Sequence, residues 1–416
     1  MKKKLVALMM VAAMAVSLTA CGSGSSDSAA PAADAAEEAE EEAAEEPAEE
    51  EAEAEAEAET EEAEEEATAP AGEAGAFDEY ERPVVVSDDE MSIIYLISNM
   101  TDESNVRPEN QVEVECAHRG WDFQCINYET EDNFRQYMDN AISQQPTAII
   151  IGITQSFPSF QDLVEKARNA GIGVYSLDNA VIPGVISNAT LDGAQAATEL
   201  MDKVSEDHPN SNYTFFELAM AEVITVRANA VKAYDGTNGM HCLGSLDIAS
   251  TGDLANGGYQ LTQTWLEQYG DDLDCIICNA DPPAMSAAEA IIQAGDPHGE
   301  KTFCTGVDGG SATWAYMRQD TPLKYTYSQP FELFAHNTCE IISDIQVKGL
   351  NPGDEGCTIS EVGETFTAPG IVTTMENVPE PGDSIHSVFD FYGEDPEDAD
   401  AWYSWNDGPG IYQVTE

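Results

Sequence analysis

The sequence predicts an α/β protein of two similar lobes, each built on a parallel sheet whose two faces are covered by helices. Short, wholly apolar runs such as 148–153 are typical of strands that are buried on both faces. These runs alternate with segments such as 131–145, in which apolar residues recur at helical spacing. The alternation restarts after Asn188, and the folded part holds about 340 residues, more than one hydrophobic core usually organises.

The N-terminus has the pattern of an export signal. Three lysines precede the apolar run 5–18, which is too short to span a bilayer with ease, and small residues stand before Cys21. The pattern resembles a bacterial lipoprotein signal. It predicts a signal peptide over 1–20 and a lipidated Cys21 that anchors the mature protein to the outer face of the cell membrane. An ordinary secretory signal with a chance cysteine is the alternative.

After the predicted signal peptide, we expect the lipidated cysteine and a disordered acidic tether over 21–90. Residues 22–76 are of low complexity, and the part from 34 to 66 holds twenty acidic residues and no basic one. Like charges at this density repel one another and keep a chain extended and solvated.

The whole chain has a formal net charge of −63, and most of its acidic residues lie outside the tether. Such a surface repels nucleic acid, and it repels anionic ligands unless a local basic group holds them. We therefore expect an extracellular protein with no nucleic-acid partner.

The first half of the folded part predicts an alternation of strands and helices. Strands are expected at 92–97, 123–128, 148–153 and 173–177. Helices are expected at 131–145, at 160–170, and over a segment that carries Val112, Val114 and Cys116 and runs up to Arg119-Gly120. Asp178 and Asn179 directly follow the last of these strands.

The second half repeats the alternation. Strands are expected at 213–218, 243–249, 273–278, 303–307 and 324–328, and helices at 194–204, 225–234, 258–269, 285–294, 311–318 and 331–348. The segment 371–378 closes the series.

Two neighbouring strands of this half end on polar side chains. Asp308 follows the strand 303–307, and Gln329 follows the strand 324–328. Ligands of open α/β sheets bind at the carboxyl ends of the strands, so the two side chains are candidates for a ligand site. An aspartate before two glycines is also an ordinary turn former, and a structural role for Asp308 stays open.

We expect no metal, no cofactor and no enzymatic activity. Cys275 and Cys278 have the spacing of a redox or metal motif, but they lie in an apolar run where residues three apart point to opposite faces. No second such motif accompanies them. Motifs of hydrolases, zinc proteases and phosphate-binding loops are missing, and the histidines form no cluster in the sequence.

Several fragments together resemble a known family. They are the strand that ends in Leu177-Asp178, the phrase TVRANAV around Arg227, CNADPPAMSAAEA, GVDGGSATWAYM, TYSQP and IVTTMENV. Over roughly 91–378 the chain resembles type I periplasmic binding proteins of the ribose- and galactose-binding kind, the solute receptors of ABC importers.

The resemblance implies two Rossmann-like lobes joined by a hinge of three crossings, which close on a ligand like a clamp. The crossings are expected near Asn188, near Pro330 and within 357–365. The N-terminal lobe then comprises 91–187 and 330–357, and the C-terminal lobe comprises 188–329 and 358–378. Residues 379–416 form an aromatic-rich extension that is expected to pack along a lobe.

The resemblance also implies a polar ring around a small neutral solute. Asp178 and Asp308 match carboxylates that accept hydrogen bonds from the ligand, Arg227 matches a donor, and Gln329 matches a contact at the hinge. The remaining candidates are Asp102 in the first loop, Asn179 beside Asp178, and Asn279, which stands one residue away from the family's position. Asp178 has an alternative role as a turn cap, and Arg227 as part of a surface ion pair.

One departure concerns the aromatic side chains that commonly sandwich a sugar ring in this family. Ser104 and Asn105 stand in the first loop instead, and the second lobe has no aromatic residue over 251–256. Phe157, Trp314 and Tyr175 are the possible substitutes, although a core role suits Tyr175 better.

We therefore expect a protein that captures a small polar solute, a sugar or polyol, and delivers it to the permease of an ABC transporter. A ligand sensor that docks on a chemoreceptor or a histidine kinase is the alternative, as is a binder of a non-sugar solute such as a nucleoside.

Overall fold

The computed structural model describes Phe77 and residues 80–154, 156–219, 221–251, 254–389, 401–405 and 413–415. The predicted signal peptide, Cys21 and the tether as far as residue 76 lie outside the described residues. Within the described part, no helix is both long and apolar enough to cross a membrane.

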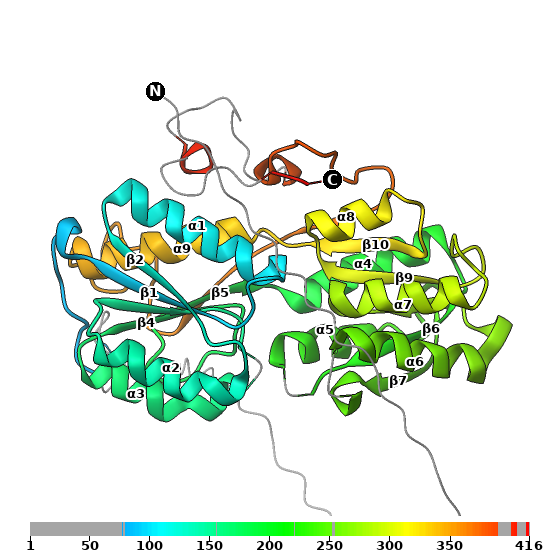
Figure 1. Ribbon diagram of the computed structural model, residues 1–416, viewed down its shortest axis with the longest axis horizontal. Helices are drawn as coiled ribbons and strands as arrows, with labels where there is room; N and C mark the ends of the chain where they lie inside the picture. Colours follow the sequence, from blue (N-terminus) through cyan, green and yellow to red (C-terminus); the bar gives the residue numbers. More distant parts are fainter. Residues whose placement is uncertain are drawn as a thin grey trace, which may run out of the picture. The chain divides into compact units, whose positions relative to one another are not determined.

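The first lobe is built on a six-stranded sheet with the order β11-β5-β4-β3-β1-β2 (Figure 1). Its strands are β1 (Ser92–Ile97), β2 (Asp122–Asn127), β3 (Ala148–Ile151), β4 (Gly173–Leu177), β5 (Ser187–Leu191) and β11 (Glu364–Ala368). Every neighbouring pair in this sheet is parallel. All the strand carboxyl ends therefore point to the same edge of the lobe.

Helices cover both faces of this sheet. They are α1 (Glu103–Arg119) and α9 (Phe331–Ile342) on one face, and α2 (Glu131–Ser143) and α3 (Gln161–Asn169) on the other (Figure 1). Alternate residues of β1 face opposite cores: Tyr95 packs with the α1 and α9 side chains, and Leu96 packs with those of α2 and α3. A π-helical turn, Ser343–Val347, extends α9.

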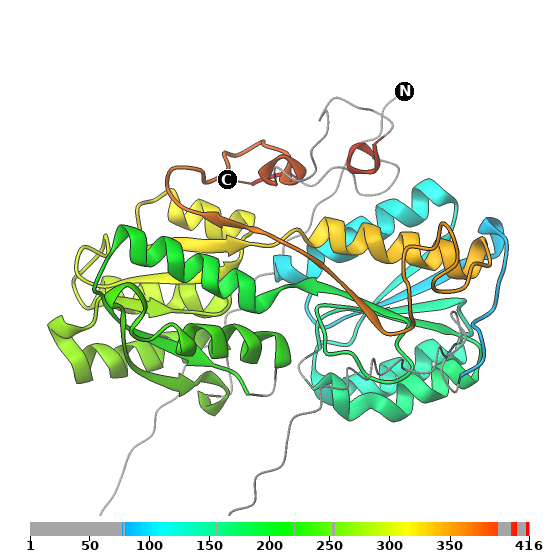
Figure 2. The same cartoon turned by 180° about the vertical axis from the view of Figure 1, so that it is seen from behind.

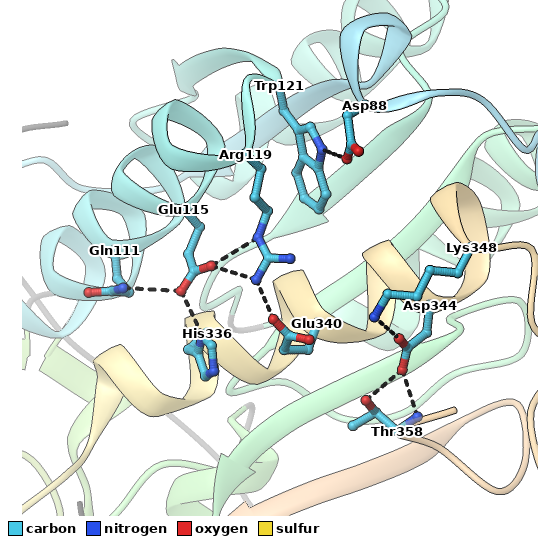
Figure 3. A network of polar contacts seen from close by, with 10 residues as sticks. All are labelled: Asp88, Gln111, Glu115, Arg119, Trp121, His336, Glu340, Asp344, Lys348 and Thr358. Atoms are coloured by element: carbon cyan, nitrogen blue, oxygen red, sulfur yellow. Dashed lines mark hydrogen bonds and ion pairs between the residues drawn. The ribbon is translucent and has the colours of Figure 1, made fainter. Parts of the chain in front are cut away.

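Polar contacts reinforce the packing of α1 against α9 (Figure 3). Glu115 of α1 is buried and accepts hydrogen bonds from Arg119 at 2.8 Å and from Nδ1 of His336 at 2.6 Å. Arg119 also pairs with Glu340 of α9. The α9 segment is thereby held on the first lobe, although it follows the strands of the second lobe in the sequence.

The second lobe repeats this architecture with the strand order β12-β10-β9-β8-β6-β7. Its strands are β6 (Asn212–Glu217), β7 (His241–Asp247), β8 (Cys275–Ile277), β9 (Phe303–Asp308), β10 (Leu323–Ser328) and β12 (Ile371–Thr373). All neighbouring pairs are parallel except the edge pair of β12 with β10, which is antiparallel. The predicted α/β architecture of two similar lobes is confirmed.

The helices of the second lobe also lie on both faces of its sheet. They are α4 (Gly193–Asp207), α5 (Glu222–Ala233), α6 (Leu254–Tyr269), α7 (Asp281–Gln293) and α8 (Ser311–Met317). The pair α4 and α5 packs on one face and the pair α6 and α7 on the other (Figures 1 and 2). Short 3-10 turns lie at Asp88–Glu90, Phe157–Phe160, Thr237–Gly239, Ile248–Thr251, Gly270–Asp272, Ile385–Val388 and Trp402–Ser404.

Two crossings between the lobes lie later in the chain than predicted. Residues 187–191 form β5, which pairs with β4 of the first sheet, so the chain crosses after Leu191 and not near Asn188. Residues 364–368 form β11, which pairs with β5, so the last crossing follows Ala368 and not 357–365. Neither strand has a continuous apolar run, because polar and apolar residues are mixed in both. The crossing near Pro330 lies between β10 and α9.

The predicted tether also ends earlier than residue 90. Phe77 is buried in the core of the first lobe. Arg82 donates hydrogen bonds to the side chain of Asn351 and the carbonyl of Ile345, and the amide of Val84 donates to Gly171. The described residues before β1 are therefore a docked part of the first lobe.

The described parts of the C-terminal extension contact both lobes. Ile385, Phe389 and Val414 are buried in the core of the second lobe. Trp402 stacks on His336 of α9 with ring centroids 4.3 Å apart, and Trp405 stacks on His118 of α1 at 3.7 Å. The extension was predicted to pack along one lobe, and its described parts pack against both lobes. Phe391, Tyr392 and Tyr412 lie outside the described residues.

We predict that Ile385→Ala destabilises the second lobe by about 2–4 kcal/mol, because it leaves a cavity at a fully buried site. Met375→Ala is the control: Met375 is 43% exposed, and its loss is expected to change the stability by about 0.5 kcal/mol or less. Urea unfolding of both variants measures the difference. Equal stabilities would show that the extension does not contribute to the core.

Candidate functional site

A cavity of about 600 Å³ lies between the carboxyl ends of the two sheets. The segments after β1, β2, β3 and β4 line it from the first lobe, and those after β6, β7, β8 and β9 line it from the second. Its volume is in the usual range for small-molecule sites. The cavity occupies the place where open parallel sheets bind ligands, and both lobes contribute walls.

Arg227 connects the two lobes across this cavity. It extends from α5, is 2% exposed, and donates a hydrogen bond from Nη1 to the carbonyl of Asn279 at 3.0 Å. Its Nη2 lies 3.9 Å from Oδ2 of Asp178 in the first lobe, and its Nη1 lies 4.0 Å from Oδ1 of Asp308 in the second. The predicted alternative of a surface ion pair does not apply, because the guanidinium is buried between two carboxylates.

Asp178 is fixed at the end of β4 in a left-handed conformation, with φ 53°. Thr190 of β5 donates a hydrogen bond to its Oδ1 at 2.5 Å, while Oδ2 faces Arg227. The carboxylate is buried and lines the cavity. One of its oxygens is thus held by the protein, and the other lies on the side of the guanidinium.

Asp308 ends β9 with φ 135°, a value that non-glycine residues rarely adopt. Gln329 donates a hydrogen bond from Nε2 to Oδ1 of Asp308 at 2.8 Å. Burial raises the pKa of the Asp308 carboxyl well above its usual range, the charge of Asp281 raises it further, and Arg227 opposes both. Besides the Gln329 side chain, the amide of Asp281 donates to Oδ2 of this carboxylate at 3.4 Å.

The other four of the seven predicted residues have side chains that are bonded to other groups of the protein. Asp102 lines the cavity, but its Oδ1 also caps α1 by accepting from the amide of Ser104 at 3.0 Å. Asn179 lines the cavity too, and its amide group is bonded to the backbone of Thr154, Ile151, Gly152 and Leu177.

Asn279 and Gln329 do not line the cavity. The Asn279 side chain donates to the carbonyl of Phe216 at 2.7 Å. The residue contacts the site through its backbone carbonyl, which accepts a hydrogen bond from Arg227. Gln329 is fully buried behind Asp308 and orients its carboxylate. Both residues act from outside the cavity wall.

Of the three aromatic substitutes, only Phe157 lines the cavity. Trp314 is fully buried and donates to Oγ of Ser328 at 3.3 Å. Tyr175 is fully buried and donates to Oε1 of Gln346 at 2.9 Å, which agrees with the core role that the sequence favours. A single aromatic side chain therefore contributes to the described walls of the cavity.

The sequence did not reveal two side chains that tie the lobes together beside the cavity. Glu103 of α1 accepts hydrogen bonds from the amides of Ser311 and Ala312, at the start of α8, at 2.8 and 3.1 Å. Arg107 is buried, pairs with Glu332 of α9 at 2.8 Å, and donates to the carbonyl of Gly309 at 2.5 Å. Charged residues within a helix pattern usually indicate an exposed face, and that rule concealed Arg107.

Carboxylates predominate among the ionisable groups of the cavity. Arg227 is the basic member of the described lining, and six acidic residues accompany it: Asp102, Glu129, Glu131, Asp178, Glu222 and Asp308. Such a lining favours ligands that donate hydrogen bonds and disfavours anions.

No group of side chains in the described part of the chain has an arrangement suited to a metal ion. Cys275 and Cys278 are buried in the cores on opposite faces of the second sheet, which confirms the orientation expected from their spacing. Burial raises the pKa of both thiols well above its usual value.

Comparisons with known proteins agree with the two-lobed α/β fold. The family described as "Periplasmic binding protein domain" matches residues 93–344. No curated protein matches the chain. Many solved structures share the fold, all of those compared below at low identity.

An ABC sugar transporter subunit from Rhodobacter sphaeroides 2.4.1 has a TM-score of 0.59 at 18% identity, over 70% of this chain and 100% of that one. A solute-binding protein from Agrobacterium vitis with bound allitol has a TM-score of 0.59 at 15% identity, over 70% and 98%. One from Bacillus halodurans C-125 with bound myo-inositol has a TM-score of 0.57 at 20% identity, over 70% and 97%.

These likenesses establish the fold, and the match over 93–344 covers more than half of the chain. The matched range begins in β1 and ends in the π-helical turn after α9, so it includes the first two crossings between the lobes and ends before the last one. The chain belongs to the family of periplasmic binding proteins, whose role is to bind solutes.

Proposed function

We propose that this protein is an exported, lipid-anchored receptor that holds a neutral sugar or polyol between its lobes and delivers it to an ABC importer. The observation that carries the proposal is the buried group of Asp178, Arg227 and Asp308, which brings hydrogen-bonding charges from both lobes to one cavity.

The chemistry of this group suits a solute with several hydroxyls. Each hydroxyl both donates and accepts, so it can bond to a carboxylate and to a guanidinium at the same time. Nε of Arg227 is buried and has no hydrogen-bond partner within the described residues, and it provides a donor for a ligand oxygen. The acidic lining disfavours an anionic solute of the same size.

The position of the group between the lobes supports a clamp. A ligand that bonds to Asp178 and Asp308 at once contacts both lobes and stabilises their closed arrangement. The allitol and the myo-inositol named as bound in two of the similar structures are solutes of this class.

Binding of neutral polyols is tested by calorimetry of the ligand-free protein against D-ribose, L-arabinose, D-galactose, myo-inositol and allitol, with uridine as a nucleoside. We expect at least one polyol to bind and to raise the melting temperature. Binding of uridine alone, or of none of these solutes, would contradict the proposal.

Asp308→Ala is expected to lower the affinity for the bound polyol about 30-fold or more, because it removes charge-assisted hydrogen bonds of about 2 kcal/mol in total. Asp271→Ala is the control, since this carboxylate lies in the same lobe and is 90% exposed. Calorimetry at neutral pH gives both affinities. Retained affinity in Asp308→Ala would place the site elsewhere.

Phe157→Ala is expected to weaken binding about tenfold, because the ring covers an apolar face of the solute. Phe160→Ala is the matched control: it lies in the same 3-10 turn, packs on Phe134, and does not line the cavity. Both variants should lose stability, and only Phe157→Ala should lose affinity. A loss of affinity in both would indicate a general effect of the turn.

The lipid anchor rests on the pattern around Cys21. Cells fed labelled palmitate should incorporate the label into the wild-type protein and not into Cys21→Ser, which cannot form the thioether. Equal labelling of both proteins would eliminate Cys21 as the site of the anchor.

A further inference from the structure

The turn between β9 and α8 is bonded to the side chain of Asp281, which is not among the residues proposed to bind the solute. Asp281 is the first residue of α7 and is 5% exposed. Its Oδ2 accepts a hydrogen bond from the amide of Gly309 at 2.8 Å, and its Oδ1 accepts one from Oγ1 of Thr326 at 2.7 Å. A single carboxylate thus joins α7, the turn after β9, and β10.

The neighbouring glycines fit this arrangement. A Cβ atom at Gly306 would lie 2.1 Å from Oδ1 of Asp281, so only glycine leaves room for the carboxylate under β9. Gly309 has φ +67°, and a Cβ there would lie 2.1 Å from Oγ of Ser328. The motif G-V-D-G-G and the distant Asp281 therefore form one structural unit.

Asp308 lies at the centre of that unit in a strained conformation, with φ 135°. Such a conformation persists only where the surroundings fix it. The amide of Gln329 donates to the Asp308 carbonyl at 2.8 Å, and Asp281 holds the amide of the next residue, Gly309. The backbone on the carboxyl side of Asp308 is thus held by Asp281 and Gln329, and its side chain is directed to the cavity.

We propose that Asp281 is a positioning residue, which fixes the Asp308 carboxylate toward the solute and thereby sets the affinity of the cavity. This inference rests on the proposed function and adds a residue to it. The side chain of Asn279, one of the candidate ligand contacts in the sequence, bonds to the backbone of Phe216 instead.

The electrostatics of the pair provide a signature of this role. Burial raises the pKa of Asp281 to about 6. Burial and the charge of Asp281 raise the pKa of Asp308 well above its usual value. The charged groups that face Asp308 are Asp281 of α7, Arg227 of α5, Asp102 before α1 and Asp178 after β4.

The sign of the pH dependence follows from the bonding. A solute hydroxyl donates to the ionised form of Asp308, so affinity should fall as the pH decreases through the raised pKa of that carboxyl. Removal of the charge at Asp281 lowers the pKa of Asp308. The acid loss of affinity should therefore move to a lower pH. The affinity at neutral pH should decrease, because the carboxamide of Asp281→Asn keeps only one of the two oxygens that accept from the Gly309 amide and the Thr326 hydroxyl, so the turn is held less firmly.

The test compares Asp281→Asn with Asp296→Asn. Asp296 also accepts backbone hydrogen bonds, from Glu300, Lys301 and Thr302 at 2.8–3.0 Å, but it does not line the cavity. Calorimetry with D-ribose, myo-inositol and allitol from pH 4.5 to 8 should show at least a tenfold loss in Asp281→Asn at pH 7.5 and a change below twofold in Asp296→Asn. Both variants should have lower melting temperatures.

A second readout needs no solute. Carbon-13 titration of the side-chain carboxyls in the ligand-free full chain, with the Asp308 signal identified by its loss in Asp308→Asn, should place the Asp308 midpoint at a lower pH in Asp281→Asn. If Asp281→Asn does not fold, Thr326→Val is used. This variant keeps the volume of the side chain at position 326 and removes the hydroxyl that donates to Oδ1 of Asp281. A severalfold loss of affinity is then expected.

Unchanged affinity in Asp281→Asn, an unchanged Asp308 midpoint, or an equal loss of affinity in Asp296→Asn would each overturn the positioning role. A wild-type protein that binds none of the solutes would contradict the proposed function, and the carboxyl titration would then decide the positioning role by itself.

Discussion

The pairing of buried charges between the lobes is the constraint on which the site depends. Removing a carboxylate or a guanidinium from water costs several kcal/mol unless an opposite charge and hydrogen bonds replace the solvent. Arg227 lies within 4.0 Å of Asp178 in one lobe and of Asp308 in the other. One guanidinium therefore faces carboxylates of both lobes at the wall of the cavity.

Backbone geometry at the strand ends determines where these charges point. Asp178 and Asp308 both have positive φ angles, at which a side chain leaves the strand direction and turns toward the cavity. Neighbouring groups keep them there: Thr190 holds the first carboxylate, and Gln329 together with the Asp281 unit holds the second.

Much of the framework could be predicted from the sequence, because apolar periodicity reports burial directly. The bounds of β1 and β4 are those expected, and the ends of the other predicted helices and strands lie a few residues away. The strands β5 and β11 were missed, since their segments S-N-A-T-L and E-T-F-T-A mix polar and apolar residues. Their membership in the first sheet depends on pairing with β4 and with each other, which no local pattern encodes.

The sequence by itself determined the α/β alternation, the two lobes, and the polar residues at the strand ends, because each of these follows from local patterns of burial and turn formation. Only the tertiary structure decided which polar groups meet: Arg227 with two aspartates, Asn279 with the backbone of Phe216, and Asp281 with the turn after Asp308. A hydrogen bond requires two groups to approach within about 3 Å, and residues far apart in the chain reach that distance only when the sheets and crossings place them there.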